Sequence, residues 1–209
     1  AHTIFNMVDF GGDSQQSLIA LMAAMVAIIV WGTVAWYFGI PTSESHALIA
    51  GLSGAAIAMQ GGIWGINGSE WIKVIYGLGL STVLGFVLGF FVCKLVSVLC
   101  GRFNRRRTDG FFKGAQIGGA TAMAFMHGAQ DGQKFLGVLL LGICLSGGND
   151  NAAGIRLPVW MMLLCSLIMG TGTSIGGKKI IKSVGMDMVK LEKYQGFAAD
   201  MAGAACLLL

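Results

Sequence analysis

The chain has 209 residues, of which 55% are hydrophobic and only 11% are charged, and its formal net charge is +4. Soluble globular domains carry roughly 25% charged residues, so this composition argues against an ordinary water-soluble enzyme, and its high hydrophobicity argues against intrinsic disorder. The 33 glycines come with only two prolines, which excludes a collagen-like chain or a proline-rich linker. The sequence predicts an all-α protein, a polytopic transmembrane helical bundle.

The first apolar stretch runs from Leu18 to Ile40 and contains no charged residue. A membrane span needs about 20 apolar residues, so this stretch predicts a membrane helix, and Trp36 and Tyr37 near its end are typical of the membrane interface. Pro41 is expected to stop it. The next apolar segment, from His46 to Gln60, is short for a full span, which leaves a half-helix and a buried helix as alternatives.

A turn-like stretch at 61–69 is followed by apolar residues from Trp71 to Cys100, with lysines only near the ends. This predicts another membrane helix. The basic stretch 102–110 comes next and carries four arginines. Such a tract can bind nucleic acid, but it flanks long apolar runs, so we interpret it as a cytoplasmic loop that follows the positive-inside rule and expect no nucleic-acid partner.

Residues 111–146 contain two glycine-rich apolar pieces separated by the polar segment His127–Lys134. Gly128 and Gly132 weaken a helix at this point. The pattern therefore predicts one broken membrane crossing through 111–146, with a re-entrant hairpin as the alternative.

The rest of the chain continues the alternation of apolar and polar segments. A turn is expected at 147–151 and a further span from Leu157 to Met169. The lysine-bearing stretch 176–193 is expected on the same side of the membrane as the arginine loop. The last helix is expected to begin near Gln195.

Two polar clusters interrupt the apolar runs, at Pro41–His46 and at His127–Lys134. Polar groups at membrane depth are costly unless paired, so such clusters indicate function. Broken helices offer N–H groups to anions and carbonyls to cations, and the carboxylate of Glu44 or Asp131 suits a hard cation. The clusters predict a site for an anion and a co-transported cation. The alternatives are a plain extramembrane loop for the first cluster and a structural ion pair between Asp131 and Lys134 for the second.

Two enzymatic interpretations are disfavoured. The segment Gly172–Lys179 comes close to a P-loop, but Lys179 stands where the Mg²⁺-binding hydroxyl belongs, and no buried strand precedes the segment. Serine, histidine and aspartate are present in the two clusters, but no G-x-S-x-G elbow supports a hydrolase. We therefore predict that the protein is not an enzyme.

The two clusters resemble motifs of the inorganic phosphate transporter (PiT) family. Pro41–His46 resembles the PxSxTH motif of the first repeat, and His127–Lys134 looks like the GAND motif of the second repeat in its HGxNDGQK form. Gly176–Gly185, followed by Gly196–Asp200, resembles the stretch that precedes the second PxSxTH motif. The resemblance implies a phosphate symporter built from two inverted repeats with broken or half helices.

The resemblance also implies a domain organisation. Residues 1–101 would be the C-terminal part of the first inverted repeat, 102–110 the basic cytoplasmic loop, and 111–209 the N-terminal part of the second repeat. The first GAND motif is then expected before Ala1 and the second PxSxTH motif after Leu209, so we expect a chain that is truncated at both ends.

The resemblance assigns roles to residues of both clusters. Phosphate is expected at Ser43, Ser45, Gln130 and Thr42. The cation is expected at Asp131, Ser43 and Glu44, with Asp131 as the ligand of a sodium ion. Supporting roles fall to His46, His127, Gln133 and Lys134. The sequence departs from the family pattern at Gln130, where the family has asparagine, and at Glu44, where it has threonine; the added carboxylate leaves Na⁺ and H⁺ open as coupling ions.

The function that follows from the resemblance is cation-coupled symport of inorganic phosphate by alternating access, in a multi-pass protein of the cell membrane. No cofactor is expected besides Na⁺ or H⁺ as coupling ion, and the expected partners are phosphate and the lipid bilayer. The alternatives are a channel-like or structural membrane subunit without coupled transport, and a transporter of another oxyanion such as sulfate. A homo-oligomer is left open.

Overall fold

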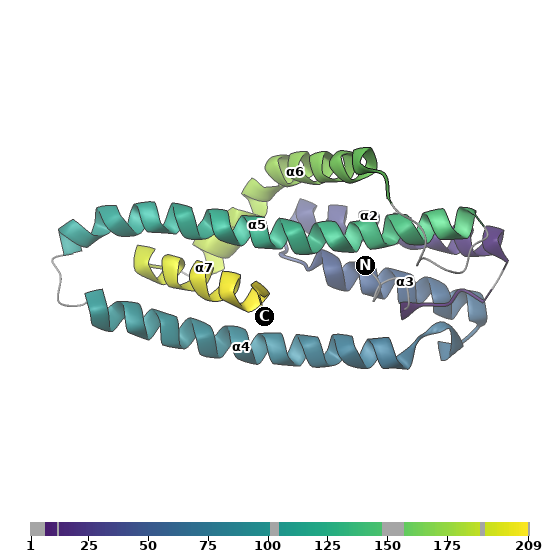
Figure 1. Cartoon of the computed structure of the whole chain (residues 1–209), viewed down its shortest axis with the longest axis horizontal. Coiled ribbons are helices and arrows are strands. Elements are labelled where there is room, and N and C mark those ends of the chain that lie inside the picture. The colour runs from purple at the N-terminus through teal and green to yellow at the C-terminus, as the bar shows by residue number, and fades with distance from the viewer. Residues whose placement is uncertain (1–6, 12, 101–104, 148–156, 189–190, 209) are drawn as a thin grey trace. The chain divides into compact units, whose positions relative to one another are not determined.

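The computed structural model describes residues 7–11, 13–100, 105–147, 157–188 and 191–208 (Figure 1). Over these residues the chain is helical, and the only β pairing is an isolated bridge between Val8 and Ile66. The helices are α2 (Ser14–Phe38), α3 (Glu44–Gln60), η1 (Ile63–Gly65), α4 (Gly68–Cys100), α5 (Arg105–Ser146), α6 (Val159–Lys182), the π-helical turn η3 (Ser183–Met188) and α7 (Lys193–Leu208). The predicted all-α class is confirmed.

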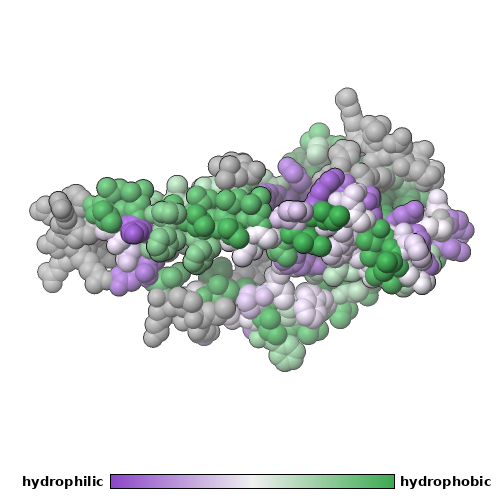
Figure 2. Space-filling model, turned by 90° about the horizontal axis from the view of Figure 1, so that it is seen from below, coloured by the Kyte–Doolittle hydropathy of each residue, from purple (hydrophilic) through white to green (hydrophobic). Residues whose placement is uncertain are grey.

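Three of the described helical segments are long and apolar enough to cross a membrane: Ser14–Phe38, Gly68–Cys100 and Val159–Gly185. In α4 and α6, whose residues are all described, no residue is buried. Figure 2 shows hydrophobic side chains over much of the face that it displays. An exposed apolar surface of this extent is typical of helices that contact lipid, which agrees with the predicted helical membrane bundle.

The chain divides into two compact units. The first contains Ala1–Ile72 and Asp131–Met188, and the second contains Lys73–Gln130 and Val189–Leu209. Both α4 and α5 cross from one unit into the other, and the boundary in α5 falls between Gln130 and Asp131.

In the first unit, α2 packs along α3 and also contacts α6. Asp13 caps the start of α2 by accepting a 2.8 Å hydrogen bond from the backbone N–H of Gln16. Small residues let α2 and α3 approach closely, because the Gly51 backbone lies against the side chain of Ile28. The buried residues of these two helices are Ser17, Ala20, Leu21, Ala24, Ala35, Leu48, Leu52, Ser53 and Ala56.

In the second unit, aromatic side chains hold α7 against the first half of α5. The Phe112 ring lies 6.3 Å from the Tyr194 ring and 6.1 Å from the Phe197 ring, measured between centroids. Further along, Gly119 of α5 faces Asp200 of α7, and a Cβ at this glycine would lie 3.2 Å from that of Asp200. An aromatic cluster and a close approach at a glycine thus both contribute to this contact.

The predicted break at His127–Lys134 is wrong, because α5 runs without interruption for 42 residues. An isolated glycine costs a helix only about 1 kcal/mol relative to alanine, and Gly128 and Gly132 lower the propensity of the helix without removing its hydrogen bonds. Neither of the two prolines lies in α5, so every residue of the helix can donate its backbone N–H.

Two predicted loops are helical in part. Within the basic stretch 102–110, residues 105–110 already belong to α5, and 102–104 lie outside the described residues. Within the lysine-bearing stretch 176–193, α6 continues to Lys182 and leads into η3. Most of the predicted turn at 147–151 also lies outside the described residues. The final helix begins at Lys193, two residues before its predicted start.

Candidate functional site

The first polar cluster lies where the chain passes from α2 to α3. The helix α2 ends at Phe38 and is capped by Gly39, which has φ +70° and donates its N–H to the carbonyls of Ala35 and Trp36. A left-handed glycine is a common C-cap, so the helix is capped two residues before Pro41, the residue predicted to end it. Ser43 then caps α3, with its Oγ accepting a 3.3 Å hydrogen bond from the His46 N–H. The predicted interruption of the helix is confirmed at this cluster.

The two polar clusters meet through Lys134. Its Nζ donates to Asp131 Oδ1 at 2.8 Å and to Ser45 Oγ at 2.6 Å. Asp131 is buried, with 7% of its surface exposed, while 34% of the Lys134 side chain is exposed. The ammonium therefore joins a nearly buried carboxylate to a hydroxyl on a different helix, and it can still be reached from outside.

This network bears on the alternative of a simple structural ion pair. Asp131 and Lys134 do form the i,i+3 pair that their spacing allows. The pair alone does not explain the bond to Ser45, which lies 89 residues away in the sequence. This charge-assisted hydrogen bond joins the two motif regions.

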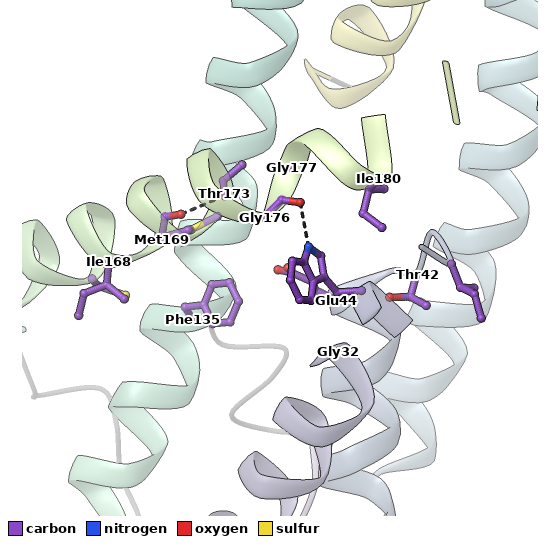
Figure 3. Close-up of a pocket in the computed structure, with 14 residues that line it drawn as sticks. Gly32, Thr42, Glu44, Phe135, Ile168, Met169, Thr173, Gly176, Gly177 and Ile180 are labelled. Carbon is purple, nitrogen blue, oxygen red and sulfur yellow. Dashed lines mark hydrogen bonds between the residues drawn. The ribbon is translucent and has the colours of Figure 1, made fainter. Parts of the chain in front are cut away.

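A cavity of about 540 Å³ opens beside the first cluster (Figure 3). Thr42 borders it from the α2–α3 connection, Glu44 from the start of α3, and Phe135 from α5. The remaining lining residues come from α2, from the connection after it and from α6: Gly32, Trp36, Ile40, Cys165, Ile168, Met169, Gly172, Thr173, Gly176, Gly177 and Ile180. The predicted ligands thus divide, since Thr42 and Glu44 line the cavity while Ser45 and Asp131 bind Lys134.

Trp36 and Lys179 form a junction between α2 and α6 that the sequence did not predict. The indole Nε1 of Trp36 donates to the Gly176 carbonyl at 3.0 Å, shown as a dashed line in Figure 3. Lys179 Nζ donates to the Tyr37 carbonyl at 2.5 Å and lies 5.3 and 5.4 Å from the ring centroids of Trp36 and Tyr37. The last carbonyls of a helix have no partner within that helix. Lys179 of α6 supplies a donor to one of these carbonyls at the end of α2. This junction fixes the end of α2 just before the first cluster.

The other predicted site residues are placed separately. Gln130 donates from Nε2 to the Leu207 carbonyl at 3.0 Å, a contact within the second unit. His127 and Gln133 are exposed on α5, and His46 is exposed in the first turn of α3. Their roles at a phosphate or cation site stay predictions.

Comparisons with known proteins agree with the motifs. The model of a family described as "Phosphate transporter family" matches residues 1–107 and, a second time, residues 101–209. A probable low-affinity inorganic phosphate transporter of Bacillus subtilis (strain 168) is 38% identical over 189 residues, covering 90% of this chain and 56% of that protein. One of Mycobacterium leprae (strain TN) is 36% identical, covering 92% of this chain and 46% of that protein.

More distant relatives carry the same kind of name. The low-affinity inorganic phosphate transporter PitB of Escherichia coli (strain K12) is 29% identical over 69% of this chain and 34% of that protein. The chain spans about half the length of the first two relatives. No solved structure matches the chain.

Proposed function

Because the chain belongs to the phosphate transporter family, we propose that it is part of a protein that carries inorganic phosphate across a membrane together with Na⁺ or H⁺, by alternating access. The family and the named relatives are transporters and not enzymes, in agreement with the absence of hydrolase and ATPase motifs from the sequence. Alternating access requires helices that move against one another around a fixed site, and the glycine-rich α6 at the edge of the cavity suits such movement.

The contacts of Lys134 with Ser45 and Asp131 support assigning the proposed site to named residues. Its ammonium is a cation within reach of an anion, and it already holds the hydroxyl of Ser45 at 2.6 Å. In the proposed site phosphate binds Ser45 and Lys134, with Ser43 and Thr42 supplying further hydroxyls and the start of α3 supplying backbone N–H groups. Asp131 binds the coupling cation. Gln130 and Glu44 keep the roles that the family resemblance implies.

The proposed setting is the cell membrane, which the protein would cross several times. The three long apolar helices support insertion into a bilayer. The two inverted repeats and the basic cytoplasmic loop between them belong to this proposal, and assembly of several copies stays a prediction.

Uptake of radioactive phosphate tests the function. The full-length protein is expressed in cells that lack their own phosphate transporters, and accumulation is measured with and without a sodium gradient and a proton gradient. We expect accumulation that collapses with one of the gradients and is not displaced by sulfate. Equilibration without accumulation would indicate the channel-like alternative, and displacement by sulfate would indicate a broader oxyanion site.

A further inference from the structure

Two large apolar side chains are exposed side by side at the turn between α3 and α4. Ile63 is 71% exposed and Trp64 is 81% exposed, and both belong to the short helix η1. The next residue, Gly65, is buried. The turn therefore packs against the protein on one side and presents an isoleucine and a tryptophan on the other.

The backbone of this turn is held in place by the N-terminal segment 7–11. Asp9 donates its N–H to the Gly65 carbonyl at 2.9 Å, and Asn67 donates its N–H to the Met7 carbonyl at 3.0 Å. The approach is close, because a Cβ at Gly65 would lie 2.6 Å from the Asp9 carbonyl oxygen. The exposed side chains of η1 thus extend from a backbone that is bonded on both sides of them.

The orientation of the Trp64 ring is constrained as well. A Cβ at Gly62 would lie 3.2 Å from Cδ1 and 3.3 Å from Nε1 of the indole, so the ring lies against the glycine backbone. A side chain that is already ordered loses little conformational entropy when it binds a partner. The turn is therefore prepared for contact before any partner is present.

The place of the turn in the chain indicates what that partner is. Helix α4 begins at Gly68 and is long and apolar enough to cross a membrane, and Trp64 precedes this helix by four residues. The end of a membrane span lies where the hydrocarbon core meets the lipid headgroups. Tryptophan is enriched at this level because its ring is apolar and its N–H is polar.

We propose that Ile63 and Trp64 form an interfacial anchor, which inserts into the lipid bilayer at the boundary between headgroups and acyl chains. Residues 1–72 contain no lysine or arginine, so the turn and the segment that braces it offer no basic side chain to anionic headgroups. Apolar contact with uncharged phospholipid carries the attachment. The anchor holds the end of α3 and the beginning of α4 at a fixed depth in the membrane.

Fluorescence quenching tests the anchor in the purified full-length protein, reconstituted into phosphatidylcholine vesicles. The emission of Trp64 is the difference between the wild type and Trp64→Phe. Bromine on the acyl chains, either close to the headgroup or near the chain end, quenches from the lipid, and iodide quenches from the water. We expect the largest loss with bromine close to the headgroup, at a depth of about 5–10 Å, and little loss with iodide. An added anionic phospholipid should leave this depth unchanged.

Trp71 provides the matched control. It lies in the first turn of α4, is half-buried, and has a buried indole nitrogen. The emission lost in Trp71→Phe should be quenched less by bromine than the emission of Trp64, although the two residues are close in the sequence. The thermal unfolding midpoint shows whether each variant folds, and Trp64→Tyr serves if Trp64→Phe does not.

Four outcomes would overturn the anchor. Quenching of Trp64 by iodide and not by bromine would place the turn in water, and quenching by neither would mean that another part of the protein or a second copy covers it. Quenching that is strongest with bromine near the chain end would place the ring in the hydrocarbon core. Equal quenching of Trp64 and Trp71 would mean that the exposed turn makes no special contact with lipid.

Phosphate uptake by the same vesicles separates the anchor from the proposed function. The depth of Trp64 does not depend on what the protein carries. A protein that shows the expected quenching without transporting phosphate would keep the anchor and lose the proposed function. A protein that transports phosphate while iodide quenches Trp64 would lose the anchor and keep the proposed function.

Discussion

Lys134 and Ser45 are 89 residues apart in the sequence, and a 2.6 Å hydrogen bond joins the Nζ of one to the Oγ of the other. The bond ties the first turn of α3 to α5 at the position where Lys134 also holds Asp131. One ammonium thus contacts a hydroxyl expected to bind phosphate and a carboxylate expected to bind the cation. Changes at these side chains should therefore affect the binding of both ions.

Removing the Ser45 hydroxyl should weaken phosphate binding. Ser45→Ala deletes an acceptor of Lys134 and a predicted ligand of phosphate, and a hydrogen bond to a charged group contributes about 1.5–3 kcal/mol. We expect the KM for phosphate uptake to rise by about tenfold or more. The measurement is the initial rate of uptake into proteoliposomes over a range of phosphate concentrations.

Ser166→Ala is the matched control, because the Ser166 hydroxyl bonds within its own helix, to the Met162 carbonyl at 2.9 Å. Its KM should stay at the wild-type value. An equal rise of the KM in both variants would show that the effect belongs to serine loss in general and would remove Ser45 from the site.

Ser43 combines a structural role with a predicted binding role, and two substitutions separate them. Its Oγ caps α3. Replacing such a cap by alanine costs about 1 kcal/mol, whereas glycine costs only a few tenths. Ser43→Ala should therefore lower the thermal unfolding midpoint more than Ser43→Gly. Both variants lack the hydroxyl, so if it binds phosphate, their affinities for phosphate should fall by a similar factor. If instead the affinity falls more in Ser43→Ala than in Ser43→Gly, in parallel with the unfolding midpoint, Ser43 acts only as a cap.

Asp131→Asn should destabilise the protein because it leaves the Lys134 ammonium beside a neutral amide. A fully buried charge without its partner costs about 3–5 kcal/mol, but Lys134 is one-third exposed, so we expect about 1–2 kcal/mol in the free energy of unfolding. The double variant with Lys134→Met should be less destabilised than the sum of the two single variants. Denaturant unfolding of the four proteins measures this coupling, and strict additivity would mean that the pair contributes nothing to stability.

The sequence predicted the helices well where apolar residues are uninterrupted and less well where small polar residues occur. The span from Leu157 was expected to stop at Met169, but α6 continues to Lys182. Its hydroxyls bond back to its own carbonyls, as in the 2.9 Å contact from Thr173 to Met169 and the 2.8 Å contact from Ser174 to Gly170. Hydroxyls satisfied in this way are compatible with a helix interior, and hydropathy alone does not register them.

The site was predictable as a set of motif residues and not as a set of contacts. The resemblance of the polar clusters to family motifs identified Asp131, Lys134 and Ser45 as candidates, and the i,i+3 spacing of Asp131 and Lys134 allowed the ion pair as an alternative. The bond from Lys134 to Ser45 depends on how α3 and α5 pack, and no local pattern encodes that. The Trp36–Gly176 contact was missed for the same reason, because its partners are 140 residues apart.

The left-handed glycine before the first cluster should not tolerate a side chain. Gly39 has φ +70°, and a Cβ there would lie 3.2 Å from Ser183 Oγ. Gly39→Ala should lower the free energy of unfolding by about 1–2 kcal/mol, which denaturant unfolding measures.

Gly54→Ala is the control, because Gly54 lies within α3 and a Cβ there would meet nothing within 4 Å beyond the backbone of its own helix. It should be neutral or stabilising by up to about 1 kcal/mol. Equal destabilisation in both variants would contradict the strained geometry at Gly39.

The junction of Trp36 and Lys179 should hold the end of α2 against α6. Lys179→Met removes the donor to the Tyr37 carbonyl and the cation above two aromatic rings, and it should cost about 1–2 kcal/mol of the free energy of unfolding. Trp36→Phe keeps a ring but removes the 3.0 Å bond to Gly176 and should cost about 1 kcal/mol. Because both changes act on one contact between helices, the double variant should lose less stability than the sum of the two single losses.

Lys178→Met, one residue away and exposed, is the control for Lys179→Met and should leave the unfolding midpoint unchanged. A loss of stability equal to that of Lys179→Met would mean that the effect comes from the charge of α6 and not from the junction of Trp36 and Lys179.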